Sequence, residues 1–236
     1  MKKNINDLLQ ELENAPKKDL SIHAMFYKTS KGDYAEHDRF RGITNPILRK
    51  IAANYNHLPL SDIETLLESS FNENRLIALF ILIFQYEKGE DTTKTDIFNF
   101  YIKNIHFINN WNLVDASAHF IVGNYLYHNE QTANLIDFAK SSHLWTKRIA
   151  IVATWFFIKK NQFDLTLKIA SILLNDTHDL IQKASGWMLR EVGKKNKDVL
   201  ISFLNQNLSQ MPRVTLRYAI ERFSESERNI YLKKLR

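Results

Sequence analysis

Apolar residues recur with a helical period along nearly the whole chain, and the helices that they predict fall into pairs. The first helices of successive pairs begin near residues 61, 94, 131, 163 and 197, a step of about 32–37 residues. Self-similarity at this period is typical of stacked helix pairs, in which each pair buries its apolar face against the next. With six Gly and four Pro in 236 residues, the chain is too poor in turn residues for an all-β sandwich. We therefore predict an all-α fold, a single domain over residues 1–236 that forms a HEAT-like helical-repeat solenoid of about six helix pairs, curved with a concave basic face.

Caps and short polar breaks predict where the individual helices begin and end. Residues 61–64 (SDIE) have the pattern of a capping box, and Asn45 before Pro46 is typical of a helix start. Polar breaks such as residues 72–74 separate neighbouring helices. The further helices are expected at about 5–13, 73–88, 94–105, 111–126, 131–140, 145–160, 163–174, 179–193, 197–207, 213–222 and 225–235.

The second helices of the pairs share a local pattern, a cation followed by apolar and small residues. It occurs at Arg75, Arg148, Lys183 and Arg217, with steps of 73, 35 and 34 residues, the first step being two periods long. Coincidence is the alternative, because Arg before Ala is common in helices, but four occurrences in register with the helix breaks favour a repeat. The repeat would place these cations in a row on one face, where they could contact the backbone of a duplex. Repeat scaffolds of this type bind proteins at least as often as they bind nucleic acid, so the row alone does not identify the ligand.

The positive charge is concentrated in the C-terminal part of the chain. The formal net charge is +6, yet residues 140–236 hold 18 Lys and Arg against 8 Asp and Glu, whereas residues 1–139 hold 14 against 18. A cation-rich half attracts a polyanion such as nucleic acid, although a lysine-rich surface that only keeps the protein soluble is the alternative.

Several chemistries are excluded by missing residues and motifs. The chain has no Cys, which excludes disulfides, thiolate zinc sites, iron–sulfur clusters and a cysteine nucleophile. It has no HExxH, GxxxxGK[ST] or GxSxG motif, and its eight His are scattered. No run approaches the ~18 apolar residues of a membrane span. We expect a cytoplasmic monomer that needs no cofactor, metal or membrane and is associated with the nucleoid when bound to DNA.

At the position where the repeat should carry another cation, the sequence is instead NNWNLVD, residues 109–115. Trp111 and Asp115 are four residues apart and share one face of a helix. A carboxylate on a wall of cations repels phosphate, which makes Asp115 a candidate for chemistry. The alternative is that Asp115 favours the helix start and Trp111 belongs to the core. Trp187 lies between the cations Lys183 and Arg190.

Gly186 and the two remaining tryptophans are interpreted as residues that serve packing. Gly186, next to Trp187, costs about 1 kcal/mol relative to Ala inside a helix, so we expect another element to pack closely against its backbone. Trp155 lies in an apolar run and is interpreted as a core residue, and Trp145 is a candidate for the core as well.

Four separated blocks of this sequence resemble the AlkD-like family of DNA alkylation repair proteins, which are DNA glycosylases built from HEAT-like repeats. The likeness covers nearly the whole length. It rests on DRFRGITNP (38–46) with Arg49 and Lys50, on NWNLVD (110–115), on WTKRIA (145–150) and on IQKASGWMLRE (181–191). The resemblance implies a monofunctional DNA glycosylase of base excision repair, which hydrolyses the N-glycosidic bond of N3- or N7-alkylated purines in duplex DNA.

The resemblance also implies roles for individual residues. Asp115 falls on the catalytic aspartate, Trp111 and Trp187 on the flanking tryptophans, and Arg148 on an arginine that contacts DNA, so a carboxylate flanked by two indoles is expected. We expect the phosphates around the lesion to be held by Arg39, Arg75, Lys147, Lys183, Arg190 and Arg217.

Two departures from the family's pattern bear on lesion preference. Where the family has aromatic residues ahead of the Trp187 helix, this chain has Asp179 and Leu180. The family's N-terminal aromatic matches either Phe26 or Tyr27. The alternative functions are a non-catalytic solenoid that binds damaged or branched DNA, and a protein-interaction scaffold.

Overall fold

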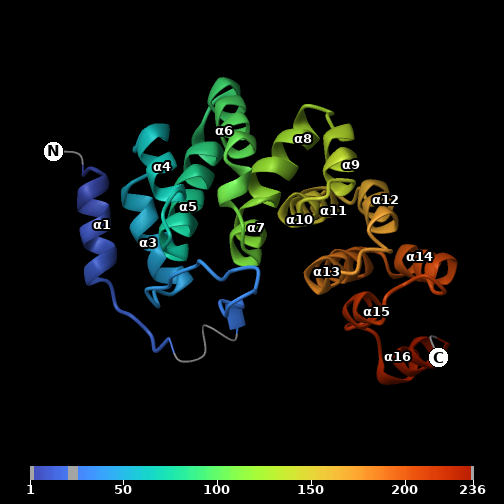
Figure 1. Cartoon of the computed structure of the whole chain (residues 1–236). Coiled ribbons are helices and arrows are strands. Elements are labelled where there is room, and N and C mark those ends of the chain that lie inside the picture. The colour runs from blue at the N-terminus through green and yellow to red at the C-terminus, as the bar shows by residue number, and fades with distance from the viewer. Residues whose placement is uncertain (1–2, 21–25, 235–236) are drawn as a thin grey trace. The chain divides into compact units, whose positions relative to one another are not determined.

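The computed structural model describes residues 3–20 and 26–234, and these residues are mainly helical (Figure 1). The one extended pairing among them is an isolated parallel bridge between Arg39 and Phe71. The prediction of an all-α chain is therefore confirmed. Of the predicted helix 225–235, residue 235 lies outside the described residues.

The chain divides into two compact units, Met1–Ser117 and Ala118–Arg236. A single domain over residues 1–236 stays a prediction. The first unit contains α1 (Ile5–Asn14), α3 (Asn45–Asn54), α4 (Leu60–Leu67), α5 (Asn72–Lys88), α6 (Asp91–Lys103), the 3-10 turn η1 (Ile105–Phe107) and α7 (Trp111–Ser117). The second unit contains the π-helical turn η2 (His119–Gly123), α8 (Asn124–His128), α9 (Ala133–Ala139), α10 (Leu144–Ala153), α11 (Trp155–Lys159), α12 (Asp164–Ile172), α13 (Asp179–Lys195), α14 (Lys197–Asn207), α15 (Arg213–Ala219) and α16 (Glu225–Lys234).

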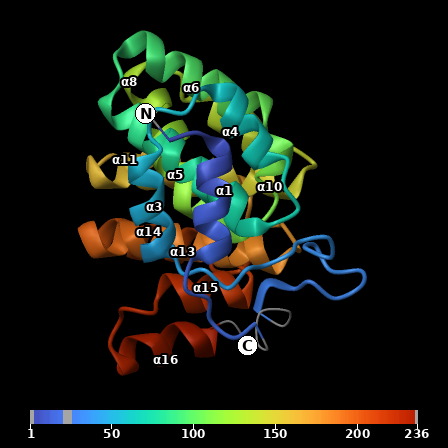
Figure 2. The same ribbon diagram turned by 90° about the vertical axis from the view of Figure 1, so that its left-hand side faces the viewer.

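Helix α5 is the central helix of the first unit. It contacts α3, α4, α6 and α7, and its residues from Asn72 to Ile83 are all buried. A helix that is apolar on all sides is stable only when other helices surround it, which is the case here. Helix α1 is amphipathic and buries Leu8 and Leu12, and Figure 2 shows it with α3 and α5.

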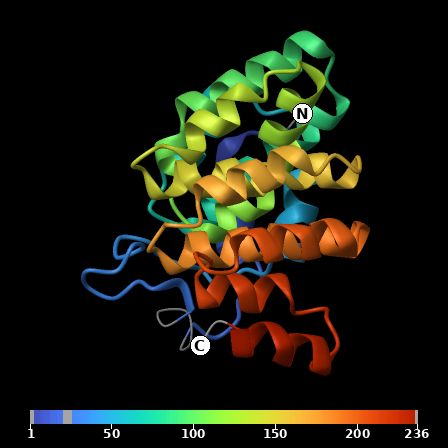
Figure 3. The ribbon, with the colours of Figure 1, turned by 90° about the vertical axis from the view of Figure 1, so that its right-hand side faces the viewer.

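Helix α13 has the same central position in the second unit. It contacts α10, α11, α12, α14 and α15, and Figure 3 shows the orange helices α13 and α14 next to each other above the red α15. A Cβ atom on Gly186 would lie 2.5 Å from the carbonyl oxygen of Thr215 and 2.5 Å from Tyr218 Cβ. The prediction that another element packs closely against this glycine is confirmed, and that element is α15.

The structure corrects the predicted helix starts. Helix α4 begins at Leu60, after Pro59, without a side-chain cap, so the capping box at 61–64 is wrong. Thr44, and not Asn45, is the N-cap of α3, whereas Pro46 lies in the first turn of that helix as predicted. Residues 72–74 are not a polar break: they are the buried first turn of α5.

Two long predicted helices are interrupted. Residues 111–126 form α7, η2 and α8 in succession, and residues 145–160 form α10 and α11 on either side of Thr154. The Thr154 hydroxyl donates to the carbonyl of Ile151 at 2.6 Å, a local bond that competes with the regular helix pattern.

Candidate functional site

Trp111 and Asp115 lie on α7 as the sequence predicts, one turn apart. Leu113 and Val114 on the same helix are fully buried, whereas Trp111 and Asp115 are half-buried. Burial raises the pKa of the Tyr101 hydroxyl, and the nearby Asp115 carboxylate adds to this rise. The carboxylate is therefore placed at the edge of the core, where its charge is only partly screened by water.

Three aromatic rings are stacked in the first unit, with Tyr27 in the middle. The Tyr27 ring lies parallel to that of Trp111, with centroids 5.3 Å apart and 10° between the planes. On its other side it stacks on Phe40, with centroids 4.4 Å apart. We call Phe40, Tyr27 and Trp111 the ring stack. Such contacts stabilise by about 0.5–1.5 kcal/mol each beyond the area that they bury.

The sequence left open whether Phe26 or Tyr27 belongs to the site, and the structure places both against Trp111. Tyr27 stacks on a face of the indole, while the Phe26 ring lies perpendicular to it, with centroids 5.3 Å apart and planes at 83°. Phe26 is 60% exposed, an unusual position for a large apolar side chain. Burial raises the pKa of Tyr27, and the charge of Glu73 raises it further.

Arg75 is buried in the first unit, and its predicted role as a phosphate contact is corrected. Its guanidinium forms an ion pair with Asp38 and donates to the carbonyl of Ser69 at 2.9 Å, and its side chain is only 6% exposed. An arginine that is neutralised and surrounded by protein does not meet a DNA backbone.

Trp187 lies on α13 in the second unit and is half-buried. The edge of one indole meets the face of another here, because the rings of Trp187 and Trp155 have centroids 5.3 Å apart at 63°. The interpretation of Trp155 as a core residue is wrong: it is half-buried, with the Lys159 amine 4.5 Å above its ring. Burial lowers the pKa of Lys159. Trp145 is buried, as its interpretation as a core residue predicts.

Trp155 is the residue that sequence reasoning missed. The apolar run around it concealed its position, because neighbouring residues such as Phe157 and Ile158 are indeed buried. A useful signal was its spacing of four residues from Lys159, which places a cation on the same helix face.

Arg148 is 5% exposed on α10, and it donates to the carbonyl of Leu180 at 2.5 Å. Leu180 is buried at the start of α13, so this bond ties the two helices together. The adjacent Asp179 is exposed and accepts from Lys183 at 2.7 Å.

The other predicted phosphate contacts differ in how available they are. Arg39 and Arg217 are exposed, and the Arg39 guanidinium lies 4.5 Å above the ring of Phe71. Lys147 pairs with Asp176, and Arg190 pairs with Glu191 and Glu221. These predicted phosphate contacts are therefore not uniformly presented to solvent.

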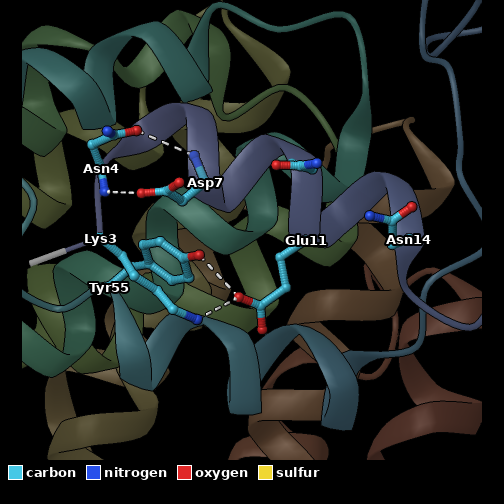
Figure 4. Close-up of a pocket in the computed structure, with 7 residues that line it drawn as sticks. Lys3, Asn4, Asp7, Glu11, Asn14 and Tyr55 are labelled. Carbon is cyan, nitrogen blue, oxygen red and sulfur yellow. Dashed lines mark hydrogen bonds and ion pairs between the residues drawn. The ribbon is translucent and has the colours of Figure 1, made fainter. Parts of the chain in front are cut away.

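A pocket of about 570 Å³ lies between α1 and the end of α3, away from every predicted residue (Figure 4). Its carboxylates already have partners. Asp7 accepts from the Asn4 backbone at 2.8 Å, and Glu11 accepts from the Tyr55 hydroxyl at 2.9 Å and from Lys3 at 3.1 Å. The charge of these groups repels phosphate, so we do not assign the pocket to DNA.

Neither a metal site nor a membrane-spanning helix is found in the described part of the chain. Over residues 3–20 and 26–234, no group of three or more His, Asp or Glu is placed to hold a metal ion. Within the same part of the chain, no helix has the length and apolar character needed to cross a membrane.

The helical pairs and the tryptophan–carboxylate pair on α7 define an all-α repeat protein with a small aromatic site. Comparison with known proteins identifies the family. The sequence profile of the family described as DNA alkylation repair enzyme matches residues 5–223, so the chain belongs to this family. Membership supports a role in the repair of alkylation damage in DNA.

A solved structure is similar over most of the chain. It is described as a predicted DNA alkylation repair enzyme from Enterococcus faecalis, with a TM-score of 0.66 and 16% identity, covering 90% of this chain and 99% of that one. At this identity the likeness shows the fold alone. No curated protein matches the chain in sequence.

Proposed function

We propose that this protein is a DNA glycosylase that hydrolyses the N-glycosidic bond of N3- or N7-alkylated purines in duplex DNA. The observation that carries the proposal is that Trp111 and Asp115 lie on one turn of α7. Both are half-buried, and the Tyr27 ring stacks on the indole. Membership of an alkylation repair family supports DNA as the substrate.

The chemistry needs little from the protein because the lesion is already activated. An alkylated purine of this kind carries a positive charge, so the electron pair of the C1′–N bond leaves with the base and neutralises it. A water oxygen then bonds to C1′, and the proton of that water passes to a carboxylate or to solvent. The barrier lies in the positive charge that develops on the sugar.

Asp115 supplies the negative charge that this transition state requires. A carboxylate at the edge of the core stabilises a developing cation more strongly than one in bulk water, and it can orient or deprotonate the attacking water. This role accounts for an acid at position 115 in a protein that is proposed to bind a polyanion. The half-buried position of Asp115 is compatible with both roles.

Trp111 and Trp187 are proposed to bind the cationic base. A cation over an indole face is stabilised by about 0.5–2 kcal/mol, and a neutral purine gains less from the electrostatic part of this contact. Tyr27 stacks on one face of Trp111 and so restricts the orientation of its ring. Trp155 contacts Trp187 edge to face rather than by stacking, and we propose that it partly replaces the aromatics that are absent at positions 179 and 180.

The exposed cations Arg39 and Arg217 are proposed as phosphate contacts, together with Lys183, whose amine is shared with Asp179. Lys147 and Arg190 contribute to a lesser extent, because each is held by carboxylates. The contact of Arg148 with DNA that the resemblance implies stays a prediction, because Arg148 is as buried as Arg75. Its bond to the Leu180 carbonyl fixes the direction of the guanidinium.

The proposal is tested by measuring release of 7-methylguanine and 3-methyladenine from randomly methylated duplex DNA. Asp115→Asn is expected to reduce release by at least about 100-fold, since general-base and charge effects contribute about 10²–10⁴-fold. Binding of undamaged duplex stays the same or tightens because a negative charge is lost. The control is Asp96→Asn, which makes the same change at an exposed position on α6.

The outcomes separate the candidate functions. If Asp115→Asn releases bases at the wild-type rate, the catalytic assignment is wrong. If the wild-type protein binds DNA with steep salt dependence but releases no base, it is a non-catalytic DNA-binding protein. Negligible DNA affinity at low salt indicates a protein-interaction scaffold.

A further inference from the structure

Four consecutive polar residues form the first turn of α5 and are buried. Asn72, Glu73, Asn74 and Arg75 are each no more than 5% exposed, although the rest of this helix is mainly apolar. Buried polar groups destabilise a fold unless they are hydrogen-bonded, so their partners show what the turn is for.

The partners of this turn lie in the loop formed by residues 38–43, which we call the 38–43 loop. Glu73 Oε1 accepts from the backbone N–H groups of Arg41, Gly42 and Ile43 at 2.9, 2.8 and 3.4 Å. The Arg41 side chain donates from Nε to Asn74 Oδ1 at 3.3 Å. The loop has no regular secondary structure over most of its length, so these bonds determine where it lies.

Asp38 is the centre of this network and the point where it reaches α7. One carboxylate oxygen pairs with Arg75, while the other accepts from Asn72 Nδ2 at 3.0 Å and from Asn110 Nδ2 at 2.8 Å. The Asp38 side chain is 5% exposed. Asn72 also accepts from Asn112 Nδ2 at 2.6 Å, which gives the network a second contact with α7.

The two outer rings of the ring stack are close in the sequence to Asp38 and to its hydrogen-bond partner Asn110. Phe40 lies two residues after Asp38, and Trp111 directly follows Asn110. Tyr27 is stacked between these two rings. A shift of the 38–43 loop relative to α7 therefore changes the spacing in which Tyr27 is held.

We propose that Asp38 is a positioning residue, which fixes the orientation of Trp111 by joining the 38–43 loop to the start of α7. The effect on catalysis rests on the function proposed above, whereas the effect on the indole does not. Asp38 belongs to the DRFRG block, in which neither the composition nor the repeat gave this residue a role. A simple core ion pair between Asp38 and Arg75 does not require the additional bond to Asn110.

The first test measures how accessible Trp111 is to acrylamide, by tryptophan fluorescence quenching in four proteins: the wild type, Asp38→Asn, Trp111→Phe and the double variant. An amide at position 38 must turn a donor either toward Arg75 or toward Asn72 and Asn110, all of which are donors, so the bonds that join the 38–43 loop to the start of α7 are weakened. We expect Asp38→Asn to increase quenching when Trp111 is present and to leave it unchanged in the Trp111→Phe background. An equal increase in both backgrounds, or no increase in either, overturns the proposal.

Two further variants provide a replacement for Asp38→Asn and a matched control. Asn110→Ala removes the link to α7 and keeps the ion pair of Asp38 with Arg75, so it replaces Asp38→Asn if that variant does not fold. It is expected to increase quenching in the same Trp111-dependent way, and the absence of an increase overturns the proposal. The matched control is Glu13→Gln, which removes an exposed carboxylate that pairs with Arg41 of the same loop. Its quenching should equal that of the wild type, and an increase equal to that of Asp38→Asn overturns the proposal.

The second test measures base release under single-turnover conditions. We expect Asp38→Asn to slow release by about twofold to tenfold, the range that corresponds to one aromatic contact, with unchanged affinity for undamaged duplex. The double variant with Trp111→Phe should be no slower than Trp111→Phe alone, because both changes act through one ring. Losses that multiply overturn the proposal. If the wild type releases no base, the proposed function fails while the quenching result still decides the role of Asp38.

Discussion

Replacing Gly186 with Ala tests whether the approach of α13 to α15 is as close as the structure shows. The added Cβ would lie 2.5 Å from the carbonyl oxygen of Thr215 and 2.5 Å from Tyr218 Cβ. Both atoms are fixed to the α15 backbone, so no side-chain rotation relieves the overlap. Thr215 also donates from its hydroxyl to the carbonyl of Gln182 at 3.2 Å, a bond that resists separation of the two helices.

Two opposing contributions determine the magnitude. Alanine in a helix interior is favoured over glycine by about 1 kcal/mol. Overpacking of a well-packed contact costs about 1–3 kcal/mol. We expect the free energy of unfolding of Gly186→Ala to fall by about 1 kcal/mol, which corresponds to a Tm that is lower by about 2–4 °C for a chain of this size.

Gly193→Ala on the same helix is the matched control. The three atoms nearest to its Cβ would all belong to the side chain of Leu200, and the nearest is the terminal Cδ2, which can rotate away. Most of the gain of about 1 kcal/mol from alanine should therefore remain. Urea and thermal denaturation of the three proteins give the comparison. If Gly186→Ala is at least as stable as Gly193→Ala, the close approach of α15 is wrong.

Three further predictions concern the aromatic contacts, the cations and the C-terminal helices. Trp155→Leu should weaken binding of methylated duplex by about twofold to tenfold through Trp187, whereas Phe156→Leu on the same helix should not; equal losses in fluorescence anisotropy would contradict a role for Trp155. Arg217→Ala should reduce the slope of log K against log salt by about 0.9, with the same effect on damaged and undamaged duplex, and an unchanged slope excludes a phosphate contact. The Lys197 amine, with Ser224, lowers the pKa of Glu227 from 4.5 to about 2, so this pairing stabilises the fold above pH 4.5 and is lost as the pH falls toward 2. The urea midpoints of the wild type and Glu227→Gln should therefore differ at pH 6 and converge near pH 2, and a difference that persists at pH 2 refutes this linkage.

The first turn of α5 shows where reading the sequence by polarity fails. Residues 72–74 have the composition of a surface break, yet they begin a central helix and are buried. Their partners, Asp38 and the backbone of the 38–43 loop, are about 30 residues away in the chain. Periodicity reports the face that a residue takes within its own helix, and it contains no information on a partner from a distant loop.

The same reason explains the errors at Arg75 and Trp155. Arg75 has the repeat position of Arg217, but an acidic residue from the 38–43 loop pairs with it, whereas Arg217 is exposed. Trp155 follows a buried run, but the helix is interrupted at Thr154, and the indole is half-buried beside Trp187. Both outcomes depend on which elements meet, so neither follows from local pattern.

The sequence by itself determined the helical content, the approximate bounds of most helices, the sharing of one face by Trp111 and Asp115, and the close packing at Gly186. These properties follow from local periodicity and from the conformational cost of single residues. The tertiary structure alone decided that Tyr27 stacks on Trp111, that Asp38 neutralises Arg75, and that Arg148 binds a backbone carbonyl of α13. Each of these contacts joins residues at least 30 positions apart, and its formation depends on how the helices pack.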